Sequence, residues 1–182
     1  MFKAGKLTIP DDEQASALYA ATQALTGAAG LPLYEISNHA RAGQESRHNL
    51  LYWRYGEYAG IGPGAHGRLI VDGVRYATST ERNPERWVSR VDEHGHGRIE
   101  DEALTPTHCA DEALLMGLRL TEGLDLTRLS SYAGTRPTDA AIADLAGLGL
   151  LESISNSRIR ATPDGRMVLN AVVRQLALSM AP

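Results

Sequence analysis

Apolar and polar side chains alternate with two different periods along the first part of the chain. Over residues 8–30 the apolar positions recur at helical spacing behind an acidic start, which predicts an amphipathic helix. Residues 33–37 instead alternate apolar and polar side chains after a proline, which predicts a short strand. A helix followed by a strand is the repeating unit of α/β folds.

The next stretch mixes a short helical run with glycine-rich segments. Residues 47–54 contain neither Gly nor Pro and predict about two helical turns. Residues 60–66 predict a strand so rich in glycine that a ligand or another backbone should approach it closely. Further on, Asp72 and Gly73 predict a tight type I′ hairpin, and a helix is expected over residues 83–92.

The last part of the chain is mainly helical. The expected elements are helices over residues 107–120, 126–132 and 138–148, strands over 150–154 and 158–161, and a last helix from residue 163. This order is winged-helix-like. A DNA recognition helix needs basic or amide donors, yet the third helix holds Asp139 and Asp144 and no Lys or Arg, so no nucleic acid is expected as a partner.

Composition and charge narrow the class of protein. The 182 residues are 43% hydrophobic, which is enough for one ordinary domain or two small ones. No run approaches the roughly 20 apolar residues of a membrane span, so no membrane span is expected and the cytoplasm is the expected location. The net charge of −4 gives no general attraction to polyanions.

Three motifs are concentrated in residues 33–68. They are EISN, beginning at Glu35, HNLLYW, from His48 to Trp53, and GIGPGAHGR, ending at Arg68. Together with EALLMGLRLTEGLDL and RATPDGRMVLNAVV further along, they resemble the C-terminal half of the oxygen-independent coproporphyrinogen III oxidase-like radical SAM family, in particular its HemW-type heme chaperones.

The resemblance implies an α/β fold in two parts. Residues 1–80 would form the C-terminal units of a partial radical SAM (β/α) barrel, with residues 1–7 as the loop after a barrel strand. Residues 81–104 would be a linker helix and loop, and residues 105–182 the HemN-type, mainly helical, winged-helix-like C-terminal domain.

One departure from the family is large. Its cluster motif, CxxxCxxC, is absent, and Cys109 is the only cysteine in the chain. An iron–sulfur cluster typically takes three or four cysteines. The S-adenosylmethionine and 4Fe-4S cluster of the full-length parent are therefore not expected to be used by this chain alone, which should be inactive as an enzyme. The chain is expected to be a fragment or truncated member that begins after the cluster-binding half.

The HNLLYW hexapeptide is the first candidate site. Imidazole is a standard ligand to heme iron, and flat aromatic side chains can pack against a porphyrin. The family resemblance implies heme binding by His48 with Asn49, Tyr52 and Trp53. The alternative is structural: His48 and Asn49 would hydrogen-bond loop backbone while Tyr52 and Trp53 fill the core.

A second candidate site would lie near the cofactor or substrate at the mouth of the barrel. Its strand-end side chains are Glu35, Ser37 and Asn38, which could equally cap the next turn. The family resemblance adds the glycine-rich residues Gly62, Pro63, Gly64, Ala65 and His66. Arg41, Arg47, Arg54 and Arg68 could pair with porphyrin propionates or be solvated. The His94 and His96 pair has too few ligands for a metal site.

The expected function is therefore that of the carboxy-terminal part of a heme chaperone that holds heme for insertion into apo-proteins. One alternative is the corresponding part of a coproporphyrinogen III oxidase in porphyrin biosynthesis, and a second is a winged-helix interaction module. The expected partners are heme or porphyrin and heme-acceptor apo-proteins. Self-association is also expected, because residues 33–36 and 58–61 would leave a sheet edge uncovered.

Overall fold

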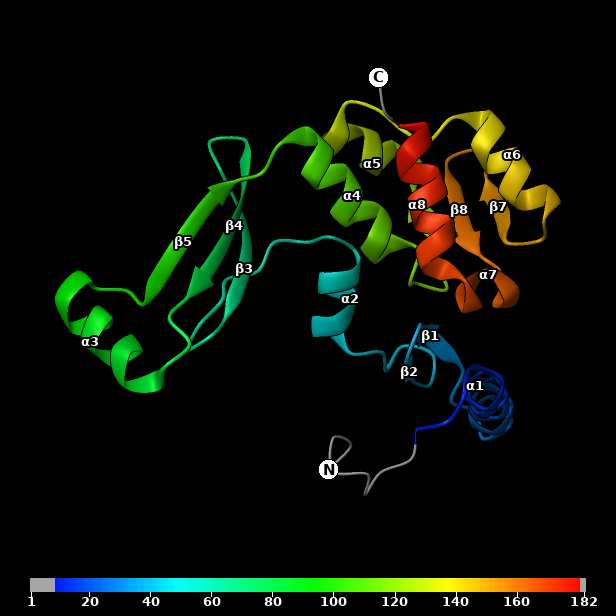
Figure 1. Ribbon diagram of the computed structural model, residues 1–182, viewed down its shortest axis with the longest axis horizontal. Helices are drawn as coiled ribbons and strands as arrows, with labels where there is room; N and C mark the ends of the chain where they lie inside the picture. The colour runs from blue at the N-terminus through cyan, green and yellow to red at the C-terminus, as the bar shows by residue number, and fades with distance from the viewer. Residues whose placement is uncertain (1–8, 181–182) are drawn as a thin grey trace. The chain divides into compact units, whose positions relative to one another are not determined.

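The structure is a computed structural model that describes residues 9–180 and divides into two units between Ser46 and Arg47 (Figure 1). The loop expected at residues 1–7 lies outside the described residues. Within residues 9–180, no helix is long and apolar enough to cross a membrane.

The first unit contains the predicted helix and strand. Helix α1 (Asp12–Ala28) begins at Asp11, whose carboxylate accepts a hydrogen bond from the Gln14 backbone N–H. Strand β1 (Leu33–Glu35) then turns at once into strand β2 (Asn38–His39), and the two pair antiparallel. The predicted strand over residues 33–37 therefore ends two residues early, because residues 36 and 37 form a turn.

The second unit opens with the predicted short helix, which is confirmed as α2 (Arg47–Trp53). The strand predicted over residues 60–66 is wrong. Gly62 and Gly64 have φ of 99° and 71°, which bend the chain out of the extended conformation. Close backbone approach does occur within the chain, since a Cβ on Gly60 would lie 2.5 Å from the carbonyl oxygen of His66.

A three-stranded antiparallel sheet follows, in the order β3-β4-β5. The predicted hairpin is confirmed as β3 (His66–Val71) and β4 (Val74–Thr80), and Asp72 and Gly73 both have the positive φ of a type I′ turn. Helix α3 (Pro84–His94) begins as predicted, with Asn83 as its N-cap. Strand β5 (Arg98–Ala103), which no hydrophobic pattern predicted, pairs with β4.

The remaining elements form the apolar core of the second unit. They are α4 (Pro106–Gly117), β6 (Leu124–Asp125), α5 (Leu126–Ala133), α6 (Asp139–Gly147), β7 (Leu151–Ser155), β8 (Arg158–Ala161), α7 (Pro163–Met167) and α8 (Leu169–Ser179). Figure 1 shows α8 beside α4 and α6, and the short strands form one sheet in the order β6-β8-β7. The most deeply buried apolar side chains include Leu114, Leu129, Ile159, Val172 and Leu176.

The prediction of a single last helix from residue 163 is wrong in one respect. Val168 has φ −118° and ψ 29°, outside the helical region, and it separates α7 from α8. Gly165 in α7 packs so closely on the Leu150 carbonyl that a Cβ there would lie 1.9 Å from the oxygen. This contact fixes α7 against the sheet, and the chain turns at Val168 before α8 packs on α4 and α6.

Candidate functional site

Helix α2 carries the HNLLYW hexapeptide and presents its two ends differently. His48 lies in the first turn with an exposed side chain, and Asn49 beside it is half-buried. Tyr52, one turn later, is half-buried between two other rings. Its ring centroid lies 5.0 Å from that of Trp53, edge to face, and 5.5 Å from that of Tyr58. The helix therefore joins an exposed imidazole to a group of three aromatic rings.

The second residue after α2, Tyr55, ends the helix with an unusual backbone conformation. Tyr55 has φ of 53°, in the left-handed region that glycine normally occupies, and it is 3% exposed. Its backbone N–H donates to the Tyr52 carbonyl at 3.0 Å, and the Gly56 N–H donates to Leu51 at 2.8 Å. A non-glycine residue there costs about 1–2 kcal/mol, so the contacts of its side chain must offset that strain.

Those contacts are made by Glu112 on α4. The Tyr55 hydroxyl donates to its Oε2 at 2.8 Å, and Arg68 of β3 donates to both carboxylate oxygens, with its Nη2 2.6 Å from Oε1. Burial alone would raise the pKa of Glu112, but the Arg68 and Tyr55 donors outweigh it and lower that pKa. Burial, reinforced by Glu112, raises the pKa of Tyr55. The carboxylate therefore ties α2, β3 and α4 together.

Arg75 of β4 supports the same tyrosine from the other side. Its guanidinium carbon lies 4.1 Å from the centroid of the Tyr55 ring and 5.1 Å from that of Tyr132 on α5. The two rings meet edge to face at 5.3 Å, and Arg75 is only 6% exposed. Its terminal nitrogens donate long hydrogen bonds to the carbonyls of Tyr55 and Gly56. This stacking adds a cation–π contribution to the anchoring of the α2 end.

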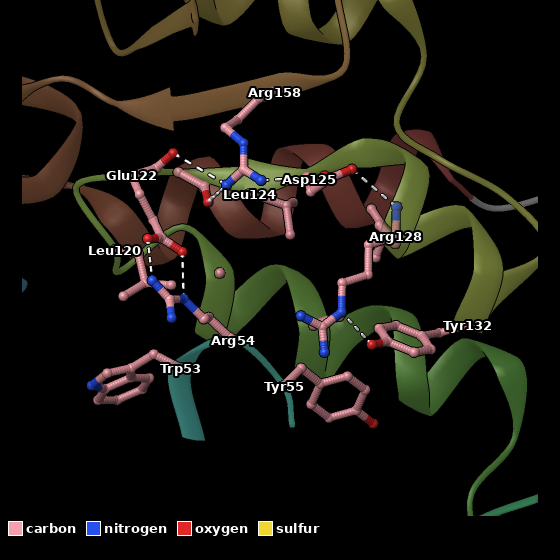
Figure 2. Close-up of a pocket in the computed structure, with 14 residues that line it drawn as sticks. Trp53, Arg54, Tyr55, Leu120, Glu122, Leu124, Asp125, Arg128, Tyr132 and Arg158 are labelled. Carbon is pink, nitrogen blue, oxygen red and sulfur yellow. Dashed lines mark hydrogen bonds and ion pairs between the residues drawn. The ribbon is translucent and has the colours of Figure 1, made fainter. Parts of the chain in front are cut away.

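A pocket of about 470 Å³ opens beside this anchor (Figure 2). Its lining comes from the end of α2, from α4 and α5, and from the β6 and β8 strands: Trp53, Arg54, Tyr55, Ala113, Gly117, Leu120, Glu122, Gly123, Leu124, Asp125, Arg128, Leu129, Tyr132 and Arg158. Figure 2 shows Trp53 and Arg54 at one end and Tyr55 and Tyr132 at the other, with Arg128 between them. Leucines form the buried part of the wall.

Ion pairs occupy much of the pocket rim. Arg54 donates to both oxygens of Glu122, at 2.7 and 2.6 Å, and these bonds lower the pKa of Glu122. Arg158 donates to Asp125 Oδ2 at 3.2 Å, while Asp125 Oδ1 caps the start of α5. Arg128 donates through Nε to the Tyr132 hydroxyl. The rim therefore holds one more arginine than it holds carboxylates.

The glycine-rich candidate residues lie at the end of the β3-β4 hairpin. Thr80 fastens them: its hydroxyl donates to the Gly62 carbonyl at 2.6 Å, and it accepts from the Ala65 N–H at 2.8 Å. The Gly64 N–H donates to the Glu81 carbonyl at 2.8 Å. Pro63 and His66 are exposed. The backbone donors of Gly64 and Ala65 are thus used within the chain, and their roles near a cofactor or substrate remain predictions.

The three strand-end candidates of the first unit form a closed cluster. Glu35 is fully buried, and its carboxylate accepts from the Ser37 N–H and hydroxyl, both at 3.4 Å, and from the Asn38 amide. These bonds hold the β1-β2 turn, as the capping interpretation of these residues expects. Any role of Glu35, Ser37 and Asn38 toward a ligand stays a prediction.

The structure places the other expected site residues in different surroundings. Among the four proposed heme contacts, Tyr52 and Trp53 meet directly, and Trp53 lines the pocket, whose described lining includes neither His48 nor Asn49. Arg54 and Arg68 are paired with carboxylates of this chain. Sequence reasoning missed Tyr55, Glu112 and Arg128. Its one signal was that the family-like motifs end at Arg68 and resume at Glu112, the two ends of an ion pair.

Comparisons with known proteins show which family the chain resembles. Residues 104–168 match the HemN C-terminal domain family. Heme chaperone HemW of Bacillus subtilis is 32% identical over 176 residues, covering 94% of this chain and 45% of that protein. Radical S-adenosyl methionine domain-containing protein 1, mitochondrial, of Bos taurus is 40% identical over 124 residues, covering 66% of this chain and 28% of that protein. The chain spans less than half the length of these relatives.

A solved structure shows the same fold. Coproporphyrinogen III oxidase of Escherichia coli, described as a radical SAM enzyme, superposes with a TM-score of 0.65 over 92% of this chain and 42% of that one, at 18% identity. The family resemblance expected from the sequence is thus confirmed. The chain carries a HemN C-terminal domain and corresponds to the C-terminal portion of the HemW-type, coproporphyrinogen oxidase-like radical SAM proteins.

Proposed function

We propose that this chain handles heme as the carboxy-terminal portion of a HemW-like chaperone, with His48 as a ligand to the heme iron. The observation that carries the proposal is helix α2, which presents the exposed His48 imidazole one turn away from the half-buried Tyr52 ring. The similarity to proteins named heme chaperone HemW supports it.

The donor set fits heme better than a bare metal ion. A single imidazole suffices for heme, because the porphyrin nitrogens themselves supply ligands to the iron. Within the described residues no group of three or more His, Cys, Asp or Glu side chains is placed to hold a metal ion. Tyr52, Trp53 and Tyr58 would supply apolar ring contacts. Burial raises the pKa of Tyr58, so its phenol stays protonated and offers a ring rather than a phenolate.

The proposal extends to the domains. Residues 105–182 would act as a winged-helix-like domain, which the sequence of α4, β6, α5, α6, β7 and β8 and the strand order β6-β8-β7 support. Residues 1–80 would correspond to the end of a radical SAM barrel, joined by a linker over residues 81–104. In the full-length parent, S-adenosylmethionine and a 4Fe-4S cluster would be bound elsewhere, and the chain would act in the cytoplasm.

The second candidate function is a part of a coproporphyrinogen III oxidase. The likeness in fold to the Escherichia coli enzyme favours it. The complete HNLLYW hexapeptide and the similarity to HemW proteins favour the chaperone instead. In the chaperone the ligand is held and passed to apo-proteins, whereas in the oxidase its propionates are the reacting groups. Iron-dependent binding through His48 is expected only of the chaperone.

The proposed partners are therefore heme, heme-acceptor apo-proteins and a second copy of this chain. Self-association is supported by the large exposed apolar side chains Leu18 and Leu25, which are 58% and 73% exposed on α1. Sedimentation velocity should show a concentration-dependent shift above the monomer value. A single monomer species at every concentration would remove this part of the proposal.

Titration with hemin tests the heme ligand. We expect the wild-type chain to shift the Soret band of hemin and His48→Ala to lose most of that shift, because the axial imidazole is gone. His94→Ala is the matched control, because His94 is also exposed and lies at the end of α3. Equal Soret shifts for the wild type and His48→Ala would contradict the proposal.

A further inference from the structure

The pocket beside α2 has the make-up of a small-molecule site, and the function proposed above uses only Trp53 of its lining. Its volume of about 470 Å³ lies in the usual range for ligand pockets. Leu120, Leu124 and Leu129 line its buried part and are 3%, 7% and 1% exposed. Aromatic rings from Trp53, Tyr55 and Tyr132 complete the wall. Such a wall favours a flat apolar body.

The charges of the pocket select the polar group of the ligand. Arg54 and Arg158 are each neutralised by a carboxylate at the rim. Arg128 is different: through Nε it donates to the Tyr132 hydroxyl, and its guanidinium carbon lies 5.6 Å from the Tyr132 ring centroid. Among the described residues no carboxylate forms an ion pair with it. Its two terminal nitrogens are thus free to donate to an anion.

Figure 2 shows the Arg128 guanidinium in the space between Arg54 and Tyr132. The hydrogen bond to Tyr132 holds the guanidinium fork, so little side-chain entropy is lost when its outer nitrogens bind a planar carboxylate. Trp53 is half-buried at the other end of the pocket, and Arg119 lies 5.4 Å from its ring centroid. A flat acid reaching from Arg128 to Trp53 would meet both a donor pair and an aromatic surface.

We propose that this pocket binds a flat aromatic acid independently of iron, with Arg128 holding a carboxylate and Trp53 contacting the ring. That the acid is a porphyrin, held by a propionate, rests on the heme-handling function proposed above. The pocket is separate from the His48 ligand, since His48 is outside its described lining. One protein would then hold the iron through α2 and recognise porphyrin carboxylates through α5.

Metal-free protoporphyrin IX is the probe, because it carries both propionates and offers no iron to His48. The chain has two tryptophans, so a Trp87→Phe background leaves Trp53 as the single reporter. We expect the porphyrin to quench Trp53 fluorescence with saturation. In this background Arg128→Gln should weaken binding about tenfold or more, which is the loss of one charge-assisted hydrogen-bonded contact. Arg128→Lys, which keeps the charge but not the fork, should fall in between.

Two controls separate the carboxylate from the ring. Arg136→Gln removes an exposed arginine that is paired with Asp139 outside the pocket, and it should leave porphyrin binding unchanged. The dimethyl ester of protoporphyrin IX should bind wild type about as weakly as the free acid binds Arg128→Gln. Arg128→Gln should have little further effect on the ester. Circular dichroism confirms that each variant is folded.

The outcomes distinguish this inference from the proposed function. Saturable quenching that Arg128→Gln leaves unchanged, or no quenching at all, would overturn the pocket inference while a His48-dependent hemin shift still stood. Conversely, porphyrin binding that Arg128→Gln weakens and His48→Ala leaves unchanged supports the pocket inference. This holds even if the Soret shift of hemin does not depend on His48.

Discussion

Replacing Glu112 by Gln should destabilise the second unit more than any exposed ion-pair change. The Glu112 carboxylate accepts three hydrogen bonds, two from Arg68 and one from Tyr55. The Arg68 and Glu112 side chains are only 17% and 23% exposed. In Glu112→Gln one acceptor oxygen becomes an N–H₂ group facing the Arg68 donors. The guanidinium then remains partly buried without its counter-charge.

The expected cost follows from that burial. Hydrogen bonds to charged groups contribute about 1.5–3 kcal/mol each, and breaking a fully buried pair costs about 3–5 kcal/mol. Because this pair keeps some exposure to water, we expect a loss of about 2–3 kcal/mol in the free energy of unfolding. For a chain of this length that lowers the melting temperature by about 4–12 °C.

The matched control is Glu122→Gln. Its partner Arg54 also forms a bidentate pair, but the two side chains are 45% and 39% exposed, so we expect a loss of about 0–1 kcal/mol. Urea unfolding followed by the fluorescence of Trp53 in the Trp87→Phe background measures both variants. Equal losses for Glu112→Gln and Glu122→Gln would refute the view that Glu112 anchors the end of α2.

The pH dependence of the free energy of unfolding gives a second check on the role of Glu112. The pKa of Glu112 is lowered in the folded protein, so its contribution to stability is complete above the unfolded value of about 4.3. It is lost as the pH falls through the folded value. The difference in stability between wild type and Glu112→Gln should therefore stay constant from neutral pH to about pH 5 and shrink below about pH 4. A gap that persists at lower pH would contradict this assignment.

Two matched glycine substitutions test the close packing beside the pocket. Gly123 has φ of 76°, and a Cβ there would lie 2.3 Å from the Ile159 carbonyl oxygen, so Gly123→Ala should cost about 2–4 kcal/mol through strain and clash. Gly149 has a similar φ of 72° but no atom within 4 Å of an added Cβ, so Gly149→Ala should cost only about 1–2 kcal/mol in urea unfolding. Equal costs would show that the Ile159 contact is relaxed without penalty.

The parts of the fold that the sequence predicted are those set by local chemistry. Asp72 and Gly73 favour positive φ at adjacent positions, which defines a type I′ hairpin, and Asn83 supplies the side-chain cap of α3. In the segment over residues 60–66, Gly62 and Gly64 are compatible with either an extended or a bent backbone. The bent backbone is stabilised by the hydrogen bonds of the Thr80 hydroxyl to Gly62 and Ala65. A partner so far along the chain leaves no local signal.

The missed elements have the same explanation. Strand β5 has the sequence RIEDEA, which is mostly charged, and every residue in it is exposed. It forms a strand because it pairs with β4, and not because it buries an apolar face. The Tyr55 and Arg68 contacts to Glu112 span 57 and 44 positions. The pocket was missed because its arginines and leucines come from the residue after α2, the loop after α4, helix α5 and two strands, and only folding brings them together.

Chemical rescue tests the central claim most directly. His48→Gly removes the exposed imidazole from the first turn of α2, so adding free imidazole to the hemin complex of this variant should restore the wild-type Soret band and the electron paramagnetic resonance signature of imidazole-ligated iron. His94→Gly should need no rescue. A wild-type spectrum for His48→Gly without imidazole would contradict the claim that His48 ligates the iron.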